Sequence, residues 1–137
     1  MPLDIQQRDR EGVTVLDLKG RITVGPEAGA LRDKVAQVLA AGTKNLVLNL
    51  QHVDYIDSTG LGAVVMISTS MRKAGGSVKL LNLNRRNIEL LVMTKLATVF
   101  EIFNDETDAV NSFYPDRKIQ TFDILNFVQQ MKKEEKE

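Results

Sequence analysis

The sequence has no cysteine and a single histidine, His52, among its 137 residues. Without cysteine the chain can form no disulfide, no thiol nucleophile and no cysteine-ligated metal site. A Ser-His-Asp triad would need His52 beside Ser58, with five residues between them and no evident group to orient the ring. Ser58 also lacks the G-x-S-x-G turn of α/β-hydrolases. The sequence therefore predicts that the protein is not an enzyme.

Cofactor and metal motifs are lacking as well. There is no Walker sequence, and Gly60-Leu61-Gly62 is too short for a dinucleotide fingerprint. Asp54 and Asp57 are only two carboxylates, which alone indicate a metal site weakly. We expect no cofactor and no metal.

Neither an excess of charge nor a long apolar run is present. Eighteen basic residues balance eighteen acidic ones, and this balance removes the electrostatic case for binding nucleic acid or an anionic membrane. No apolar run approaches the roughly 18 residues of a membrane span, and the N-terminus does not have the pattern of a signal peptide. The expected location is the cytoplasm.

Alternating strand and helix patterns fill most of the chain. Strand patterns cover residues 3–7, 13–19, 45–50, 77–83 and 100–103, and 20–25 reads as a loop. Helical spacing covers residues 26–41, 58 to the glycines at 75–76, 85–96, and a short stretch after Asp105. The order predicts an α/β fold, with a mixed, mostly parallel sheet of about five strands covered by about four helices. We assign this domain to residues 1–113.

Residues 114–137 form a C-terminal extension, in which 121–131 has the pattern of an amphipathic helix. Its apolar face carries Ile124, Phe127, Val128 and Met131. We expect this helix to dock on the sheet domain of its own chain or of a second copy, away from Ser58. The second arrangement would give a homodimer through the extension. The alternative is a tail that folds only on a partner.

The polar cluster Asp57-Ser58-Thr59 lies where the central strand gives way to a helix. The first amides of a helix lack internal partners, so Asp, Ser and Thr are favoured there as caps. These amides and the helix dipole also tolerate a phosphate. Ser58 is therefore expected to be a capping residue and a candidate phospho-acceptor, and a simple cap, worth about 1 kcal/mol, is the alternative.

The helix that follows has two different sides at 100° per residue. The side expected to face the core carries Leu61, Val64, Ser68 and Met71, with Gly60 and Ile67 at its margin. The opposite side carries Ser58, Gly62, Met66, Thr69 and Lys73, with Thr59 and Ala63 between the two. The second side suits a docking surface around Ser58, although small residues also allow close packing on a neighbouring helix. Right-handed crossovers should bring residues 21–24 and 84–86 to the same sheet edge.

The hexapeptide Asp57-Ser58-Thr59-Gly60-Leu61-Gly62, following a buried strand, resembles the signature of STAS domains and, more narrowly, of bacterial anti-sigma factor antagonists. The resemblance spans about residues 3–113. It implies that unmodified protein binds an anti-sigma factor with serine kinase activity and thereby frees the sigma factor. Phosphorylation of Ser58 would then release the kinase, and a separate serine phosphatase would reset the switch.

The resemblance also implies which residues meet the partner. They are Asp57, Ser58, Thr59, Gly60 and Gly62 from the signature. The outward side of the helix adds Met66 and Thr69 to the expected contact surface, and the predicted sheet edge adds Arg21 and Thr23. Relatives commonly carry an acidic residue after the second strand, where this chain has Thr23. This departure favours a different cognate partner. The alternative function is that of a STAS module in a signalling assembly or a transporter, where no phosphorylation is needed.

Overall fold

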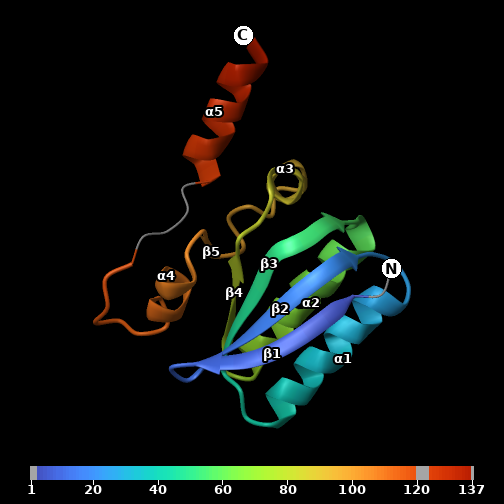
Figure 1. Cartoon of the computed structure of the whole chain (residues 1–137), viewed down its shortest axis with the longest axis vertical. Coiled ribbons are helices and arrows are strands. Elements are labelled where there is room, and N and C mark those ends of the chain that lie inside the picture. Colours follow the sequence, from blue (N-terminus) through green and yellow to red (C-terminus); the bar gives the residue numbers. More distant parts are fainter. Residues whose placement is uncertain (1–2, 120–123, 137) are drawn as a thin grey trace.

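Five strands form one sheet in the order β1-β2-β3-β4-β5 in the computed structural model, which describes residues 3–119 and 124–136 (Figure 1). The strands are β1 (Asp4–Arg10), β2 (Val13–Ile22), β3 (Asn45–Ile56), β4 (Ser77–Leu81) and β5 (Ile102–Phe103). β1 pairs with β2 antiparallel, and the remaining neighbours are parallel. The predicted mixed, mostly parallel sheet is confirmed.

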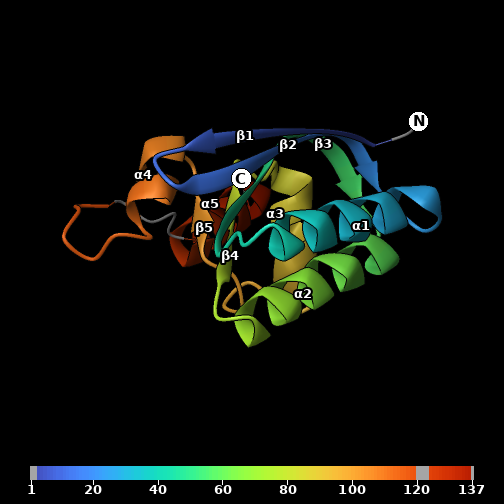
Figure 2. The same cartoon turned by 90° about the horizontal axis from the view of Figure 1, so that it is seen from below.

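The helices divide between the two faces of the sheet. α1 (Pro26–Ala40), α2 (Ser58–Lys73) and α3 (Arg85–Met93) connect successive parallel strands and share the larger apolar core. α4 (Glu106–Asn111) covers a smaller core on the other face, built around Phe103 and Val110. Figure 2 shows α1 and α2 side by side beneath the strands. This arrangement follows from right-handed crossovers between strands that are consecutive in the sequence.

The two central strands are longer than predicted. β2 continues through residues 20–22, which were predicted to be part of a loop, and β3 continues through residues 51–56. Register shifts between Asp17 and Lys19 and between Gly20 and Arg21 break the alternation of side chains, so the sequence pattern ends before the pairing does. Ile22 is fully buried and lies beside Ile56 at the end of the ladder. The loop between β2 and α1 is therefore only residues 23–25.

Other elements end earlier than predicted, at residues with left-handed backbone. Asn82 has a φ of 59° and follows the last residue of β4, which was predicted to reach residue 83. Lys95 has a φ of 62°, and α3 stops at Met93 instead of residue 96. Neither residue is a glycine, so sequence alone did not mark these positions. β5 is also shorter than predicted, since it begins at Ile102 instead of residue 100.

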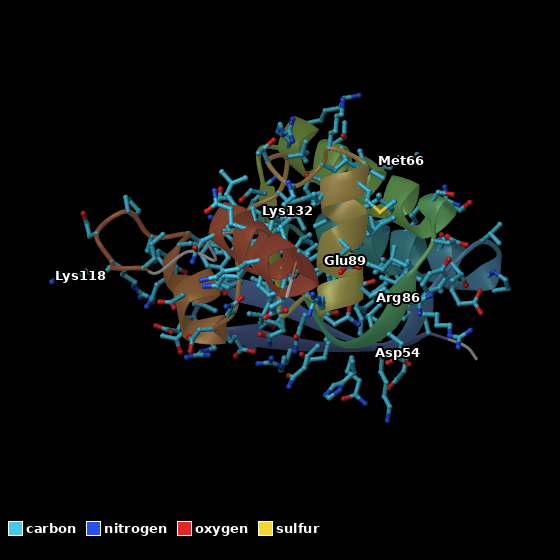
Figure 3. The ribbon with its side chains drawn as sticks, turned by 90° about the horizontal axis from the view of Figure 1, so that it is seen from above. Asp54, Met66, Arg86, Glu89, Lys118 and Lys132 are labelled. Carbon is cyan, nitrogen blue, oxygen red and sulfur yellow. The ribbon has the colours of Figure 1, made fainter. Side chains whose placement is uncertain are left out.

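The C-terminal helix α5 (Ile124–Lys136) packs on α3 of its own chain. Ile124 is buried, and Phe127 and Val128 pack against the larger core. The first turn of α5 lies beside Val92 and Ala97, and Glu134 in its last turn pairs with Arg85 at 3.3 Å. Figure 3 looks down on α3 and α5 lying side by side. Residues 121–123 of the predicted helix lie outside the described residues.

None of the helices in the described ranges is long and apolar enough to cross a membrane.

Candidate functional site

The carboxylate of Asp57 joins the start of α2 to the loop after β2. Asp57 is the N-cap of α2, and its Oδ1 accepts a hydrogen bond of 2.7 Å from the backbone N–H of Gly60. Its Oδ2 accepts a second, of 2.9 Å, from the backbone N–H of Val24. These two bonds hold the pKa of Asp57 below its usual range because they stabilise the carboxylate. The prediction that Ser58 caps the helix is wrong, since Asp57 does so and Ser58 is the first helical residue.

Ser58 lies on the outward side of α2. Ser58, Gly62, Met66 and Thr69 are exposed, and 56% of the Met66 surface is accessible. The core side is buried over Leu61, Val64, Ile67, Ser68 and Met71. The predicted division of the helix into two sides is therefore confirmed. Thr59, placed between the two sides, is exposed as well.

The two glycines of the signature differ in their surroundings. A Cβ atom added to Gly60 would overlap the carbonyl group of Ile22, whereas one added to Gly62 would meet nothing within 4 Å. Gly60 is buried, and its lack of a side chain lets α2 approach the end of β2. Packing within the chain therefore explains why residue 60 is a glycine. It does not explain why residue 62 is one, because the space beside Gly62 on the outward side is open.

A hollow of about 220 Å³ opens next to Ser58, between α2 and α3. Its walls are formed by the end of β3, the start of α2 and one side of α3, with Tyr55, Ile56, Asp57, Ser58, Arg86, Glu89, Leu90 and Met93. The guanidinium carbon of Arg86 lies 4.4 Å from the centre of the Tyr55 ring. Figure 3 labels Arg86 and Glu89 on α3 and Met66 on α2.

Two asparagines fix the start of α3 beside this hollow. Asn84 caps α3 by accepting from the backbone N–H of Asn87, and its own amide nitrogen donates to the carbonyl of Val53 at 3.1 Å. The buried amide nitrogen of Asn87 donates to the same carbonyl at 3.0 Å. The position of α3 relative to the end of β3 is therefore set by hydrogen bonds to the β3 backbone.

The predicted sheet edge brings residues 21–24 and 84–86 near Ser58. Arg21 is exposed and in register with Tyr55, which contacts Arg86. Thr23 is half-buried, and its carbonyl accepts from the N–H of Ala28 at 3.3 Å, in the loop that Asp57 holds. The three chain segments thus meet at one edge, as expected from the crossovers.

His52 does not join this edge. It lies within β3 in register with Lys19, and the four residues from there to Ile56 span about 13 Å of strand. The geometry thus argues against the triad with Ser58. No group of three or more His, Asp or Glu side chains that could hold a metal occurs among residues 3–119 and 124–136.

The sequence analysis did not identify the residues of α3 that line the hollow beside Ser58. Arg86, Glu89, Leu90 and Met93 are spaced i, i+3, i+4 and i+7, so they form one stripe on that helix. Met93, at the end of this stripe, is 81% exposed. The helical spacing, combined with the predicted sheet edge, carried enough information to find this stripe.

Comparisons with known proteins agree on one family. The family model described as the STAS domain matches residues 4–109. The anti-sigma-B factor antagonist of Bacillus subtilis is 34% identical over 102 residues, which cover 74% of this chain and 92% of that protein. The anti-sigma-F factor antagonist RsfB of Mycobacterium tuberculosis is 30% identical over 114 residues, 80% of this chain and 90% of the relative.

A solved structure agrees on the fold. The crystal structure of an anti-sigma factor antagonist from Mycobacterium paratuberculosis matches with a TM-score of 0.69 at 22% identity, covering 80% of this chain and 92% of that one.

Proposed function

This chain belongs to the STAS domain family and, within it, to the anti-sigma factor antagonists, and from that premise we propose a phosphorylation-controlled binding function. In its unmodified form the protein binds an anti-sigma factor that is also a serine kinase, so that the sigma factor is free. Phosphorylation of Ser58 ends this binding, and a serine phosphatase restores it. The family is generally non-catalytic, and the proposed role needs no catalysis, cofactor or metal.

The observation that carries the proposal is the position of Ser58. Its hydroxyl belongs to the first turn of α2, on an exposed side that otherwise carries Gly62, Met66 and Thr69. Apart from Lys73 in the last turn of α2, this side is uncharged, and the apolar groove of about 200 Å³ between α1 and α2 borders it at Met66. Such a surface suits a protein partner with apolar or acidic contacts.

A phosphate at this position would change the surface and leave the fold intact. The kinase would join Ser58 Oγ to the γ-phosphorus of ATP, releasing ADP and the hydroxyl proton. The modified side chain carries about −1.5 to −2 charges. The dipole of α2 favours an anion at its start by roughly 0.3–1 kcal/mol, so the helix should persist. The partner, however, would face a bulky dianion, and repulsion and desolvation would cost several kcal/mol of binding.

We assign the partner contacts to the exposed residues of this edge. Ser58, Thr59, Gly62, Met66 and Thr69 come from α2, and Arg21 and Thr23 come from the end of β2. Asp57 and Gly60 are proposed to shape the surface from beneath, since their hydrogen bonds and packing are internal. With Thr23 where an acidic residue is common, we propose a kinase whose matching surface differs from that of other relatives.

Incubation with the candidate kinase and ATP tests the assignment of Ser58. Intact-mass analysis should show one phosphate on wild type and on Thr59→Ala, and none on Ser58→Ala. Thr59 is the matched control because it is the adjacent exposed hydroxyl, about 100° around the helix. Phosphate that persists on Ser58→Ala would overturn the assignment. Binding that never depends on Ser58 would instead support the unphosphorylated module of a signalling assembly or transporter.

The proposed location is the cytoplasm, where a sigma factor and its regulators act. We propose no contact with nucleic acid or membrane, in keeping with the zero net charge. A homodimer through the C-terminal extension stays a proposal, to be tested by sedimentation.

A further inference from the structure

We infer that Arg86 is the built-in counter-ion of a phosphate on Ser58. The two side chains line the same hollow, one from the start of α2 and the other from the first turn of α3. The inference rests on the proposal that Ser58 is the acceptor. It concerns what the phosphate meets in this protein and not which enzyme attaches it.

Within the part of the chain whose side chains the structure describes, Arg86 forms no ion pair with an acidic residue. Among residues 3–119 and 124–136, the Arg and Lys residues that form ion pairs are Arg8, Arg10, Lys79, Arg85 and Arg117. The neighbouring Arg85 has two partners, Glu89 at 3.5 Å and Glu134 at 3.3 Å. Arg86 instead lies over the face of Tyr55, which leaves the guanidinium N–H groups at its edge able to donate. The planar fork of N–H groups matches a phosphate in shape and charge.

The hollow has room for the phosphate, and its other charged groups are already engaged. Its volume of about 220 Å³ is several times the roughly 30 Å³ that one water occupies in the liquid. Both oxygens of Asp57 accept backbone hydrogen bonds, and Glu89 pairs with Arg85. The ring contact, together with the asparagine bonds that place α3, holds Arg86 on the α3 wall of the hollow that Ser58 also lines.

The consequence is a switch with two parts. In the unmodified protein, Arg86 presents its positive charge on the edge that the partner is proposed to meet. In the phosphorylated protein, the phosphate forms an ion pair with the guanidinium of Arg86. A carboxylate of the partner would therefore no longer find Arg86 available, and it would also be repelled by the phosphate dianion. The pair between Arg86 and the phosphate would stabilise the phosphorylated form.

Phosphoserine placed at position 58 during translation tests this inference without any kinase. The second pKa of the phosphate is followed by ³¹P NMR in the full chain, at an ionic strength of about 0.1 M. We expect this pKa to be lower by about 0.5 unit than in Arg86→Gln, since a nearby cation favours the dianion. Asp57, Glu89, Tyr55, Arg85 and Arg21 lie around the hollow or beside it and are unchanged in both proteins.

Arg72→Gln is the matched control. It removes the same charge from the last turn of α2, fourteen residues and about 21 Å from Ser58, beyond the Debye length of roughly 8–10 Å in ordinary buffers. It should leave the phosphate pKa as in wild type, and Arg86→Lys should restore part of the difference. Equal pKa values in wild type, Arg86→Gln and Arg72→Gln would overturn the inference. Failure of every candidate kinase to modify Ser58 would count against the proposed function only.

Discussion

The two sides of α2 differ in what their residues touch. On the inner side, Leu61, Val64 and Met71 are buried in the main core, and Gly60 packs against the carbonyl of Ile22. On the outer side, Ser58 and Met66 are exposed, and a side chain at Gly62 would reach open space. Changes on the inner side should therefore alter stability, and changes on the outer side should alter binding. The signature motif spans both sides, so its residues need not share one role.

The largest effect is expected for Gly60→Ala. Its Cβ would meet backbone, the Ile22 carbonyl that also accepts from the N–H of Asp57 at 3.2 Å, so relief requires α2 or β2 to move. We expect a loss of about 3 kcal/mol of unfolding free energy, measured by urea denaturation. Gly62→Ala is the control, and replacing a helical glycine in open space should stabilise by roughly 0.5–1 kcal/mol. Equal losses in the two variants would refute the difference between the sides.

The next effect concerns the attachment of α5. Ile124 is 9% exposed and the adjacent Leu125 is 67% exposed. We expect Ile124→Ala to lower the unfolding free energy by about 2 kcal/mol and Leu125→Ala to leave it within about 0.5 kcal/mol. Two similar small effects would mean that the helix does not depend on this contact.

Truncation after Lys118 separates docking on the same chain from docking on a second copy. It removes α5 and keeps Tyr114, whose hydroxyl donates to the carbonyl of Glu11, and Arg117, which pairs with Glu11 at 3.1 Å. Docking on the same chain predicts lower thermal stability with an unchanged oligomeric state in sedimentation. A dimer that dissociates on truncation would instead support the homodimer, and no change in either quantity would leave a tail that folds only on its partner.

A smaller effect is expected for Asp57→Ala. Loss of the cap should cost about 1 kcal/mol near neutral pH. Because the folded state lowers the pKa of Asp57, its stabilisation is present above the unfolded value near 3.9 and is lost as the pH falls through the folded value. Chemical denaturation should therefore show the two proteins converging in stability below about pH 4. Asp54→Ala, which removes an exposed neighbouring carboxylate, should change stability by less than about 0.5 kcal/mol.

The smallest effect on stability is expected on the outer side. Met66→Glu should stay within about 0.5 kcal/mol of wild type and weaken binding to the cognate partner at least about tenfold. Leu125→Glu is the matched control, since it makes the same kind of change at an exposed position of α5 and should bind as wild type does. A steep fall in melting temperature with binding intact would mean that Met66 belongs to the core.

The sequence was sufficient for the parts of the site that follow regular geometry. The turn of 100° per residue placed Met66 outside and Met71 inside, and the rule for crossovers brought Thr23 and Arg86 to one edge with Ser58. It was insufficient where the backbone departs from regularity. Bulges hid the last residues of β2, and the left-handed Lys95 ended α3 early. The N-cap at Asp57 was missed as well, because Asp57, Ser58 and Thr59 are all residue types that can cap a helix.

The direct test of the central claim is the affinity of the cognate anti-sigma factor for two forms of the full chain, unmodified and carrying phosphoserine at position 58. Calorimetry should show a loss of at least about 100-fold on phosphorylation, corresponding to roughly 2.7 kcal/mol. Amide NMR spectra of the two forms should differ only around the hollow and the outer side of α2. Equal affinities, or a phosphorylated form that loses the native spectrum, would contradict the account.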